Sequence, residues 1–263
     1  LLTIDILSSC NQCNAFLEDK SQNYNKIRLM TFNTGMSNDF KNIRELILFE
    51  KPDIIQFQEV SPQMQNKLKS LKSLFPYNTG LDKPQEYLSS IILSKYPLKN
   101  NEVLDNYTVL TKVVLDEAEL TIIGIHIAAP LNPLLLKLYV NLYFHFNNLT
   151  QTQELKLNSM DFAIKQMKYL KTLIDNTNQN LILMGDLNMT TTSKRFTNFL
   201  KETNLYTYTS YKHPTFTWPA FVPGYLGIQI DHVLFSENFK VIRKKTTNHF
   251  GSDHRALIVD LAF

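Results

Sequence analysis

The alternation of hydrophobic and polar positions along the chain predicts buried strands that end in polar side chains. The clearest example is LILMGDLN at residues 181–188, where four apolar residues precede Gly185, Asp186 and Asn188. An uninterrupted apolar run is typical of a strand buried on both faces, and a glycine at its end lets the backbone turn or approach a ligand closely. Ligand sites in open α/β sheets lie at such strand ends. Asp186 and Asn188 are therefore candidate site residues; an Asx-type turn is the alternative interpretation.

Seven further stretches show strand-like apolar patterns, and most carry a polar residue at or near one end. These stretches are residues 27–33, 53–59, 90–94, 109–115, 120–126, 228–235 and 256–261. The polar residues associated with them are Asn33, Glu59, His126, Asp231, Asp253 and His254. Because similar side chains recur at several strand ends, a shared site is favoured over a set of unrelated turns.

Apolar residues at helical spacing predict helices between these strands. The predicted helices run from about residue 38 to Pro52, from Ser61 to about residue 74, and over residues 153–176 and 192–202. Ser61 suits the N-cap of its helix, and Pro62 suits the first helical position. No linker rich in Pro, Gly or Ser interrupts the pattern. We therefore predict one α/β domain at residues 26–263, in which strands alternate with helices.

Two segments lie outside this pattern. Residues 1–25 are predicted to form an extended N-terminal arm, and because the chain starts at Leu1 rather than Met, we expect a fragment or a processed form. Residues 131–150 are rich in leucine and aromatic side chains but include polar ones. They are too short and too polar for a bilayer span, which needs about 20 mostly apolar residues. An amphipathic helix on the core is the first interpretation, and an apolar lobe that contacts a membrane surface or a partner is the second.

Composition adds only weak restrictions. A net charge of +3 over 263 residues is no basic footprint, although it does not oppose a phosphate-bearing substrate. Cys10 and Cys13 are the only cysteines, so no second pair is present to complete a zinc site. We expect them to be incidental or to form a local disulfide in an oxidising compartment. With the apolar start of the chain, they favour a secreted, periplasmic or membrane-linked protein over a cytoplasmic one.

The candidate residues combine three kinds of chemistry. Carboxylates such as Glu59 and Asp253 suit an oxygen-seeking divalent cation, most naturally magnesium, with manganese as the alternative. The two histidines can transfer protons near neutral pH, and Asp186 and Asn188 can orient a water molecule and a phosphate oxygen. No Ser or Cys stands beside a His in a way that suggests a covalent nucleophile. No His pair has the helical spacing of zinc ligands.

Six stretches, in order, resemble the motifs of the endonuclease/exonuclease/phosphatase superfamily. They are IRLMTFN, PDIIQFQEV, GIHIAAP, LILMGDLN, QIDHVLFS and GSDHRALIVDL, and they run from about Ile27 to Phe263. That superfamily includes pancreatic-type deoxyribonucleases, repair endonucleases, bacterial sphingomyelinases and inositol polyphosphate 5-phosphatases. The loop before IDH looks most like that of uncharacterised bacterial members. The resemblance implies a four-layer α/β sandwich, made of two packed mixed β-sheets flanked by helices, with the site at the strand ends. We also expect a monomer.

The resemblance implies roles for the metal-binding and water-binding residues. Glu59 would be the principal magnesium ligand with Asn33 beside it, and Asp253 would contribute through water or at a second metal position. Asp186 would orient or activate the attacking water. Asn188 would hold a phosphate oxygen.

The resemblance also implies roles for the histidines. His254 would be a general base or a phosphate-contacting residue oriented by Asp231, and His126 matches the second catalytic histidine of deoxyribonuclease-like members. His232 is predicted to be a packed core histidine. The sequence departs from the repair endonucleases because no second acid follows Asn33 closely and because no cluster of Arg and Lys with interleaved aromatics is present.

These features predict a magnesium-dependent hydrolase of phosphodiester bonds, with nucleic acid as the first substrate class. A phospholipid, sphingomyelin or inositol-phosphate substrate is the alternative, with the same site and a membrane contact through residues 131–150. A catalytically silent binding scaffold is disfavoured, because every catalytic position that matches the superfamily carries a competent residue.

Overall fold

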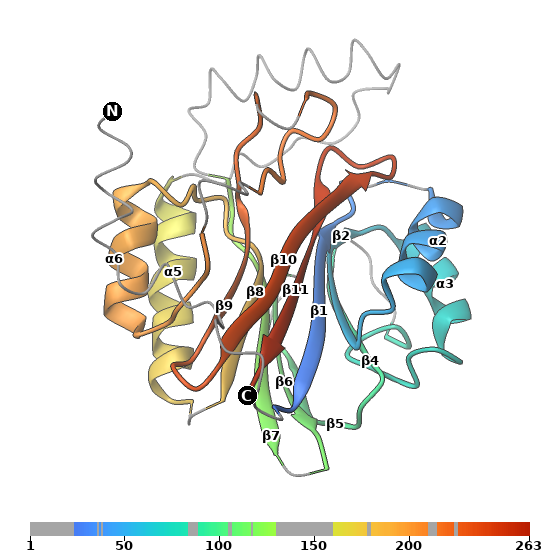
Figure 1. The fold of residues 1–263 in the computed structure, drawn as a ribbon, viewed down its shortest axis with the longest axis horizontal. Coiled ribbons are helices and arrows are strands. Elements are labelled where there is room, and N and C mark those ends of the chain that lie inside the picture. The colour runs from blue at the N-terminus through green and yellow to red at the C-terminus, as the bar shows by residue number, and fades with distance from the viewer. Residues whose placement is uncertain are drawn as a thin grey trace.

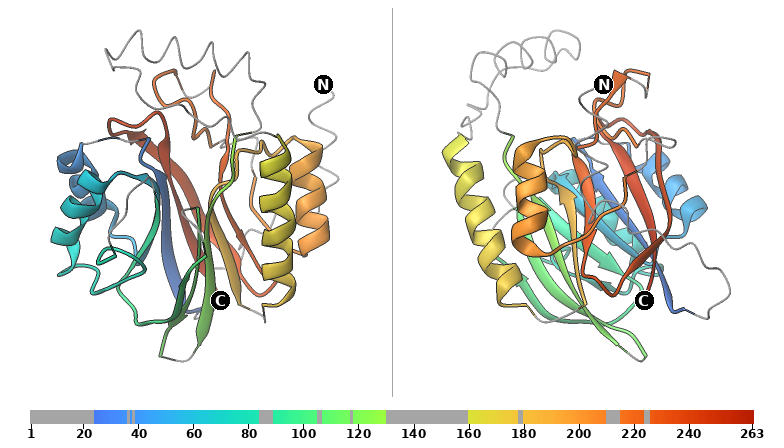
Figure 2. Two further views of the ribbon diagram at one scale, coloured as in Figure 1. Left: turned by 180° about the vertical axis from the view of Figure 1, so that it is seen from behind. Right: turned by 60° about the vertical axis from the view of Figure 1, so that its left-hand side comes forward.

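Two mixed β-sheets pack face to face, and helices cover their outer faces (Figures 1 and 2). The computed structural model describes residues 24–35, 37, 39–83, 89–104, 107–116, 118–129, 160–177, 180–209, 215–223 and 226–263. The predicted four-layer α/β sandwich is confirmed. Residues 1–23 of the predicted arm, with Cys10 and Cys13, and the segment 131–150 lie outside the described residues.

The first sheet has six strands in the order β10-β11-β1-β2-β4-β3. Their bounds are β1 Lys26–Asn33, β2 Ile54–Val60, β3 Tyr77–Asn78, β4 Ser89–Ser94, β10 Lys240–His249 and β11 Arg255–Ala262. Strands β1 and β2 are parallel, and the other neighbours are antiparallel.

The second sheet has five strands in the order β5-β6-β7-β8-β9. Their bounds are β5 Leu98–Val103, β6 Thr108–Val114, β7 Glu119–His126, β8 Leu181–Asp186 and β9 Asp231–Phe235. Strands β7 and β8 are parallel, and the remaining pairs are antiparallel.

Three of the described helices, α2, α3 and α6, begin at side chains that cap them. Their bounds are α2 Phe40–Glu50, α3 Pro62–Leu68 with the 3₁₀ turn η2 Lys69–Leu71, α5 Met160–Asp175 and α6 Lys194–Thr203. The side chains of Asp39, Ser61 and Ser193 accept the backbone N–H three residues on, at the starts of α2, α3 and α6. The cap at Ser61 and the helical start at Pro62 are confirmed. None of the described helices is long and apolar enough to cross a membrane.

Three apolar layers hold these elements together. Ile27, Ile122 and Met184 belong to the layer between the two sheets. A second layer joins the six-stranded sheet to α2 and α3, and a third joins the five-stranded sheet to α5 and α6, as Figure 2 shows. The central strands meet an apolar layer on each face, which is why LILM in β8 has no polar interruption.

The structure corrects the predicted pattern in two ways. Strands do not alternate with helices throughout, because β3 to β7 follow one another directly, as do β9 to β11. In addition, β3, β5 and β10 were not predicted. β5 and β10 are edge strands with many polar or charged residues, so they lack the apolar run that marks the central strands. The strand predicted at 228–235 begins at Asp231.

The strand register places the polar strand ends together. His126 at the end of β7 pairs with Asp186 at the end of β8, which in turn pairs with Asp231 at the start of β9. Gly185 is required beside this point: its φ is +147°, and a Cβ there would overlap the carbonyl oxygen of Ile125. In the six-stranded sheet, the parallel strands β1 and β2 end close to this point, with Asn33 at the end of β1 and Glu59 near the end of β2. Both sheets therefore contribute to one site.

Candidate functional site

An asparagine links the two sheets at the centre of the site. Asn33 Nδ2 at the end of β1 donates to Glu59 Oε1 (3.1 Å) and to Asp186 Oδ2 (3.2 Å). Asn33 Oδ1 accepts from the N–H of Gly35 (2.9 Å). His126 Nε2 lies 3.6 Å from both of those carboxylate oxygens. In this arrangement Asn33 holds two carboxylates in place through its amide nitrogen.

A buried histidine–aspartate pair lies on the other side of Asp186. His254 Nδ1 is 2.9 Å from Asp231 Oδ2, and His254 Nε2 is 3.7 Å from Asp186 Oδ2. An ionised carboxylate only accepts hydrogen bonds, so Nδ1 carries a proton and Nε2 is directed toward Asp186. Thr217 Oγ1 accepts the backbone N–H of Asp231 (3.2 Å). The pair is therefore fixed from both the side chain and the backbone.

Asp253 is held over the site by the chain's single tryptophan. Trp218 Nε1 donates to Asp253 Oδ2 (3.0 Å), and the N–H of Ala220 donates to the Asp253 carbonyl (2.7 Å). Asp253 Oδ1 fills the space above Gly35, where φ is +51° and a Cβ would overlap that oxygen. One carboxylate oxygen is thus used for positioning, while the other is directed to the Asn33 side of the site.

Asn188 occupies the turn that follows β8. Its backbone N–H donates to Asp186 Oδ1 (2.9 Å), and its Nδ2 donates to the carbonyl of Ile127 (2.8 Å). Its φ is +48°, a conformation that asparagine tolerates better than most residues. The Asx-type turn weighed from the sequence is therefore present. Because the amide nitrogen carries two hydrogens, Asn188 can bridge to Ile127 and still donate to a ligand.

Burial perturbs the carboxylates on the metal side of the cluster. Burial raises the pKa of Glu59, and the charge of Asp253 raises it further, while the hydrogen bond from Asn33 lowers it. Burial and the nearby Asp231 carboxylate raise the pKa of Asp186 to about 6, against the influence of the neighbouring histidines. Because both pKa values are raised despite Asn33 and the histidines, the neighbouring groups stabilise the negative charge of Glu59 and Asp186 only in part.

The histidines respond to their partners in opposite ways. Burial lowers the pKa of His254, but the charge of Asp231 and the hydrogen bond to it outweigh burial and raise that pKa to about 10. Burial also raises the pKa of Asp231, yet His254 brings it below its ordinary value. Burial lowers the pKa of His126 despite the nearby Asp186. His254 is therefore protonated at neutral pH, and His126 is neutral.

The side chains present fit a divalent cation. Ligand atoms of Asp186, Asp231 and His254 all lie within 4.8 Å of one another, a spacing that could hold a metal ion once the His254 ring gives up a proton. The Glu59 side chain, beside this group, is more accessible than that of Asp186, with 24% exposed against 2%. Oxygen donors of this kind suit magnesium or manganese, and a cation would offset the buried negative charge.

Residues without a local sequence signal support the site. Gln166 on α5 accepts the N–H of Ala128 (2.8 Å) and donates to the carbonyl of His126 (3.3 Å). Ser252 Oγ donates to the carbonyl of Asn33 (2.8 Å) and accepts the N–H of His254 (2.9 Å). A glutamine on a helix and a serine before a strand are common, so these roles were not predicted. Trp218 alone carried a signal, as the only tryptophan, in a loop rich in Pro and Gly.

His232 is a core histidine, as predicted. Its Nε2 is 2.7 Å from the carbonyl oxygen of Met189, and its Nδ1 is 3.3 Å from Gln229 Nε2. Its ring lies against Phe196, with centroids 4.4 Å apart. Because a carbonyl only accepts, Nε2 carries the proton and Nδ1 accepts from the glutamine. Burial lowers the pKa of His232 to about 3, so the ring is neutral in the folded protein.

We expect His232 to make the protein less stable as the pH falls. Its folded pKa of about 3 lies below the ordinary value of 6.5, so the unfolded chain binds the additional proton. The stability that depends on neutral His232 is complete above pH 6.5 and is lost toward pH 3, by about 1.4 kcal/mol per pH unit. Urea unfolding of the wild type and His232→Gln between pH 7.5 and 5 measures this. The unfolding free energy of the wild type minus that of the variant should decrease as the pH is lowered below 6.5. If the two unfolding free energies changed in parallel with pH, His232 would not be the neutral buried group that we describe.

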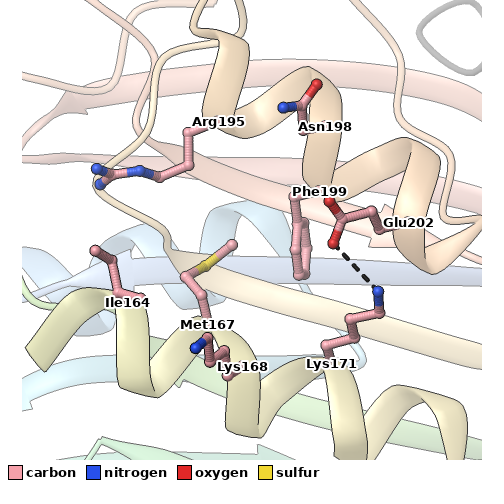
Figure 3. Close-up of a pocket in the computed structure, with 8 residues that line it drawn as sticks. All are labelled: Ile164, Met167, Lys168, Lys171, Arg195, Asn198, Phe199 and Glu202. Carbon is pink, nitrogen blue, oxygen red and sulfur yellow. Dashed lines mark hydrogen bonds and ion pairs between the residues drawn. The ribbon is translucent and has the colours of Figure 1, made fainter. Parts of the chain in front are cut away.

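A separate hollow of about 240 Å³ lies between α5 and α6 (Figure 3). Ile164, Met167 and Lys171 line it from α5, and Phe199 and Glu202 line it from α6. Lys171 Nζ is 3.2 Å from Glu202 Oε2, and both side chains are well exposed, so their ion pair adds little stability. The residues that line this hollow include none of the predicted site residues, and we assign it no part in the chemistry.

Comparisons with known proteins agree with this geometry. The model of the Endonuclease/Exonuclease/phosphatase family matches residues 30–254. No curated protein sequence matches this chain. A mutant of beta toxin from Staphylococcus aureus with bound magnesium ions is similar in structure, with a TM-score of 0.63, 16% identity, and coverage of 89% of this chain and 99% of that chain.

Two further solved structures are similar at low identity. Sphingomyelinase C from Streptomyces griseocarneus has a TM-score of 0.56 and 12% identity, covering 90% of this chain and 99% of that chain. Truncated TDP2 from Caenorhabditis elegans has a TM-score of 0.56 and 16% identity, and the match covers 90% of this chain and 98% of that chain. At these identities the likeness shows a shared fold.

Proposed function

Because this chain belongs to the endonuclease/exonuclease/phosphatase family, we propose that it is a divalent-metal-dependent hydrolase of phosphodiester bonds. One observation carries the proposal: Asp186 lies between the Glu59–Asn33 side of the site and the His254–Asp231 pair, within 3.7 Å of groups on both sides. A water-activating carboxylate between a cation site and a positively charged histidine is an arrangement suited to phosphoester hydrolysis.

Glu59 is the proposed principal magnesium ligand, and Asp253 is the proposed second acidic contributor. Asn33 positions Glu59 and Asp186, since its amide nitrogen faces both carboxylates, and its oxygen, which accepts from the Gly35 N–H, keeps a second lone pair for the proposed magnesium. The magnesium ions bound to the beta toxin mutant support magnesium as the metal for a protein of this fold. Bound magnesium would supply positive charge against the phosphate and the leaving oxygen.

In the proposed reaction, water attacks phosphorus in line with the leaving alcohol oxygen. Asp186 orients this water and accepts its proton, for which a pKa of about 6 is suited near neutral pH. The new P–O bond forms to the water oxygen while the bond to the alcohol oxygen breaks. The alkoxide that leaves takes up a proton from solvent, and Asp186 releases to solvent the proton that it accepted. His254 stays protonated and donates from Nε2 to a phosphate oxygen, while Asp231 holds Nδ1. Asn188 is the proposed second donor to the phosphate.

Nucleic acid and phospholipid remain the two candidate substrate classes. Nucleic acid was the first prediction, and strong binding to it needs Lys and Arg near the site. The loop that carries Trp218 beside Asp253 has no charged residue between His213 and Asp231. That observation favours an amphiphilic phosphodiester, and the sphingomyelinase C among the similar structures supports the same class.

The proposal is tested with bis(4-nitrophenyl) phosphate, a water-soluble phosphodiester, in Mg²⁺, in Mn²⁺ and in EDTA. We expect hydrolysis in either metal, loss of it in EDTA, and recovery when Mg²⁺ is restored. Plasmid, single-stranded DNA, RNA, sphingomyelin vesicles and phosphoinositides then rank the substrate classes. Activity that is indifferent to the chelator, or absent on every phosphodiester, would refute the proposed function.

A further inference from the structure

Three apolar side chains are exposed on the loop beside Asp253. Phe221 is 65% exposed, Leu226 64% and Ile228 41%. Large apolar side chains that gather on one exposed segment mark a contact surface more often than scattered single residues do. We call these three residues the apolar rim.

Hydrogen bonds attach the apolar rim to the site. Trp218 and Ile228 exchange two backbone hydrogen bonds (3.0 and 2.7 Å), so Ile228 lies opposite the residue whose indole holds Asp253. Phe221 directly follows Ala220, whose N–H donates to the Asp253 carbonyl. The N–H of Leu226 donates to the carbonyl of Pro223 (2.9 Å), which keeps Leu226 in the same turn.

An arginine fixes the loop from the other side. Arg255 Nη2 donates to the carbonyls of Ala220 (3.0 Å) and Val222 (2.8 Å), and its N–H donates to the carbonyl of Thr217 (2.8 Å). Figure 1 shows this loop in orange at the top of the molecule, at the end where β10 turns into β11. These bonds hold the backbone on either side of Phe221, next to Asp253.

The composition of the loop distinguishes between the two substrate classes. No charged residue lies between His213 and Asp231. A surface that follows a nucleic-acid backbone needs cations for the phosphates, and this rim offers none. Binding to a lipid surface instead becomes stronger when apolar side chains beside a polar site are buried in the membrane interface.

We propose that the apolar rim of Phe221, Leu226 and Ile228 contacts a phospholipid membrane surface and so presents a lipid phosphodiester headgroup to the site. This inference rests on the proposed function and narrows its substrate class. It places the membrane contact on the loop before β9. Residues 131–150, for which a membrane or partner contact was the second interpretation from sequence, lie outside the described residues.

Another exposed aromatic residue provides a matched control. Phe49 on α2 is 79% exposed, with Lys245 Nζ 5.9 Å from its ring centroid. It belongs to the helix that covers the six-stranded sheet and carries none of the site residues. Phe49→Ser therefore removes a phenyl ring that is at least as exposed as that of Phe221, from a helix outside the loop.

Vesicle binding tests the inference directly, because Trp218 is the only tryptophan and reports on the loop itself. Vesicles of sphingomyelin and brominated phosphatidylcholine, in EDTA to prevent hydrolysis, should quench its fluorescence in the wild type and in Phe49→Ser. We expect Phe221→Ser/Leu226→Ser to bind vesicles at least 10-fold more weakly. The ratio of its hydrolysis rates on sphingomyelin vesicles and on bis(4-nitrophenyl) phosphate, in Mg²⁺, should fall at least 10-fold.

Equal vesicle binding by the double variant and the wild type would overturn the inference. The inference would also be overturned if the wild type hydrolysed the soluble diester but neither bound vesicles nor cleaved sphingomyelin. If that wild type cleaved plasmid or RNA, its substrate class would be nucleic acid. In both cases the proposed function stands. Failure to hydrolyse any phosphodiester, soluble or in vesicles, in any metal refutes the proposed function separately.

Discussion

Glu59→Gln is expected to abolish metal-dependent turnover while leaving the fold intact. The substitution keeps the side-chain oxygen that accepts from Asn33 Nδ2 but removes the charge that we propose binds magnesium. Loss of one such electrostatic group costs roughly 3 kcal/mol or more in transition-state stabilisation, which is a rate decrease of about 10²-fold or more. Hydrolysis of bis(4-nitrophenyl) phosphate across a magnesium titration measures the loss.

Stability measurements separate a metal ligand from a structural acid in this test. Burial already raises the pKa of Glu59, so removal of its charge should not lower the unfolding free energy in metal-free buffer. Magnesium should raise the melting temperature of the wild type and not that of Glu59→Gln, because only a protein that binds the ion gains stability from it. Glu119→Gln, on an exposed acid paired with Lys99, is the matched control. Unchanged activity of Glu59→Gln in magnesium would remove Glu59 from the site.

Single substitutions of Asp231 and His254 are each expected to reduce activity by about 10²-fold or more. Asp231→Asn keeps the shape of the side chain but loses the charge that holds His254 Nδ1 at 2.9 Å. His254→Ala removes the group that donates to the phosphate. If the two residues act as one unit, the double variant should be scarcely worse than His254→Ala alone.

The pH profile gives this cycle a second readout. Asp231 raises the pKa of His254 to about 10, so Asp231→Asn should lower that pKa and make His254 lose its proton at a lower pH. Activity of the variant should therefore decline with rising pH earlier than that of the wild type. Circular dichroism and thermal unfolding check folding, because removing one partner of a buried charged pair destabilises a protein. Losses that multiply would show that Asp231 and His254 act independently.

Much of the fold followed from local patterns along the chain. The apolar-rich runs at β1, β2, β7 and β8 marked the central strands, because a strand covered on both faces is rich in apolar residues. Ser61 and Pro62 marked the start of α3, because capping depends on neighbouring residues only. The edge strands β5 and β10 were not predicted from the sequence. An edge strand pairs along one side only and can carry many polar residues, so its sequence resembles that of a loop.

Residue types and motif order also identified the candidate site. The eight candidate residues lie at or beside strand ends in the described structure, and this position could be predicted because strand ends follow from the apolar pattern. Their chemical character, oxygen donors with two histidines, is a property of the residues themselves and indicated a divalent cation before any distance was known.

Only the tertiary structure decided how these residues act on one another. Asn33 and Asp186 are 153 positions apart, and their hydrogen bond exists because two separate sheets pack with their strand ends together. Burial and the Asp231 charge raise the pKa of Asp186, whereas the Asp231 charge and hydrogen bond raise the pKa of His254 against the effect of burial. Folding brings these groups together, and no local pattern records that. The positions of Trp218 over Asp253 and of Gln166 beneath His126 likewise depend on loop and helix packing. Local sequence determined which groups are available, and long-range packing determined their distances, charge states and accessible surface.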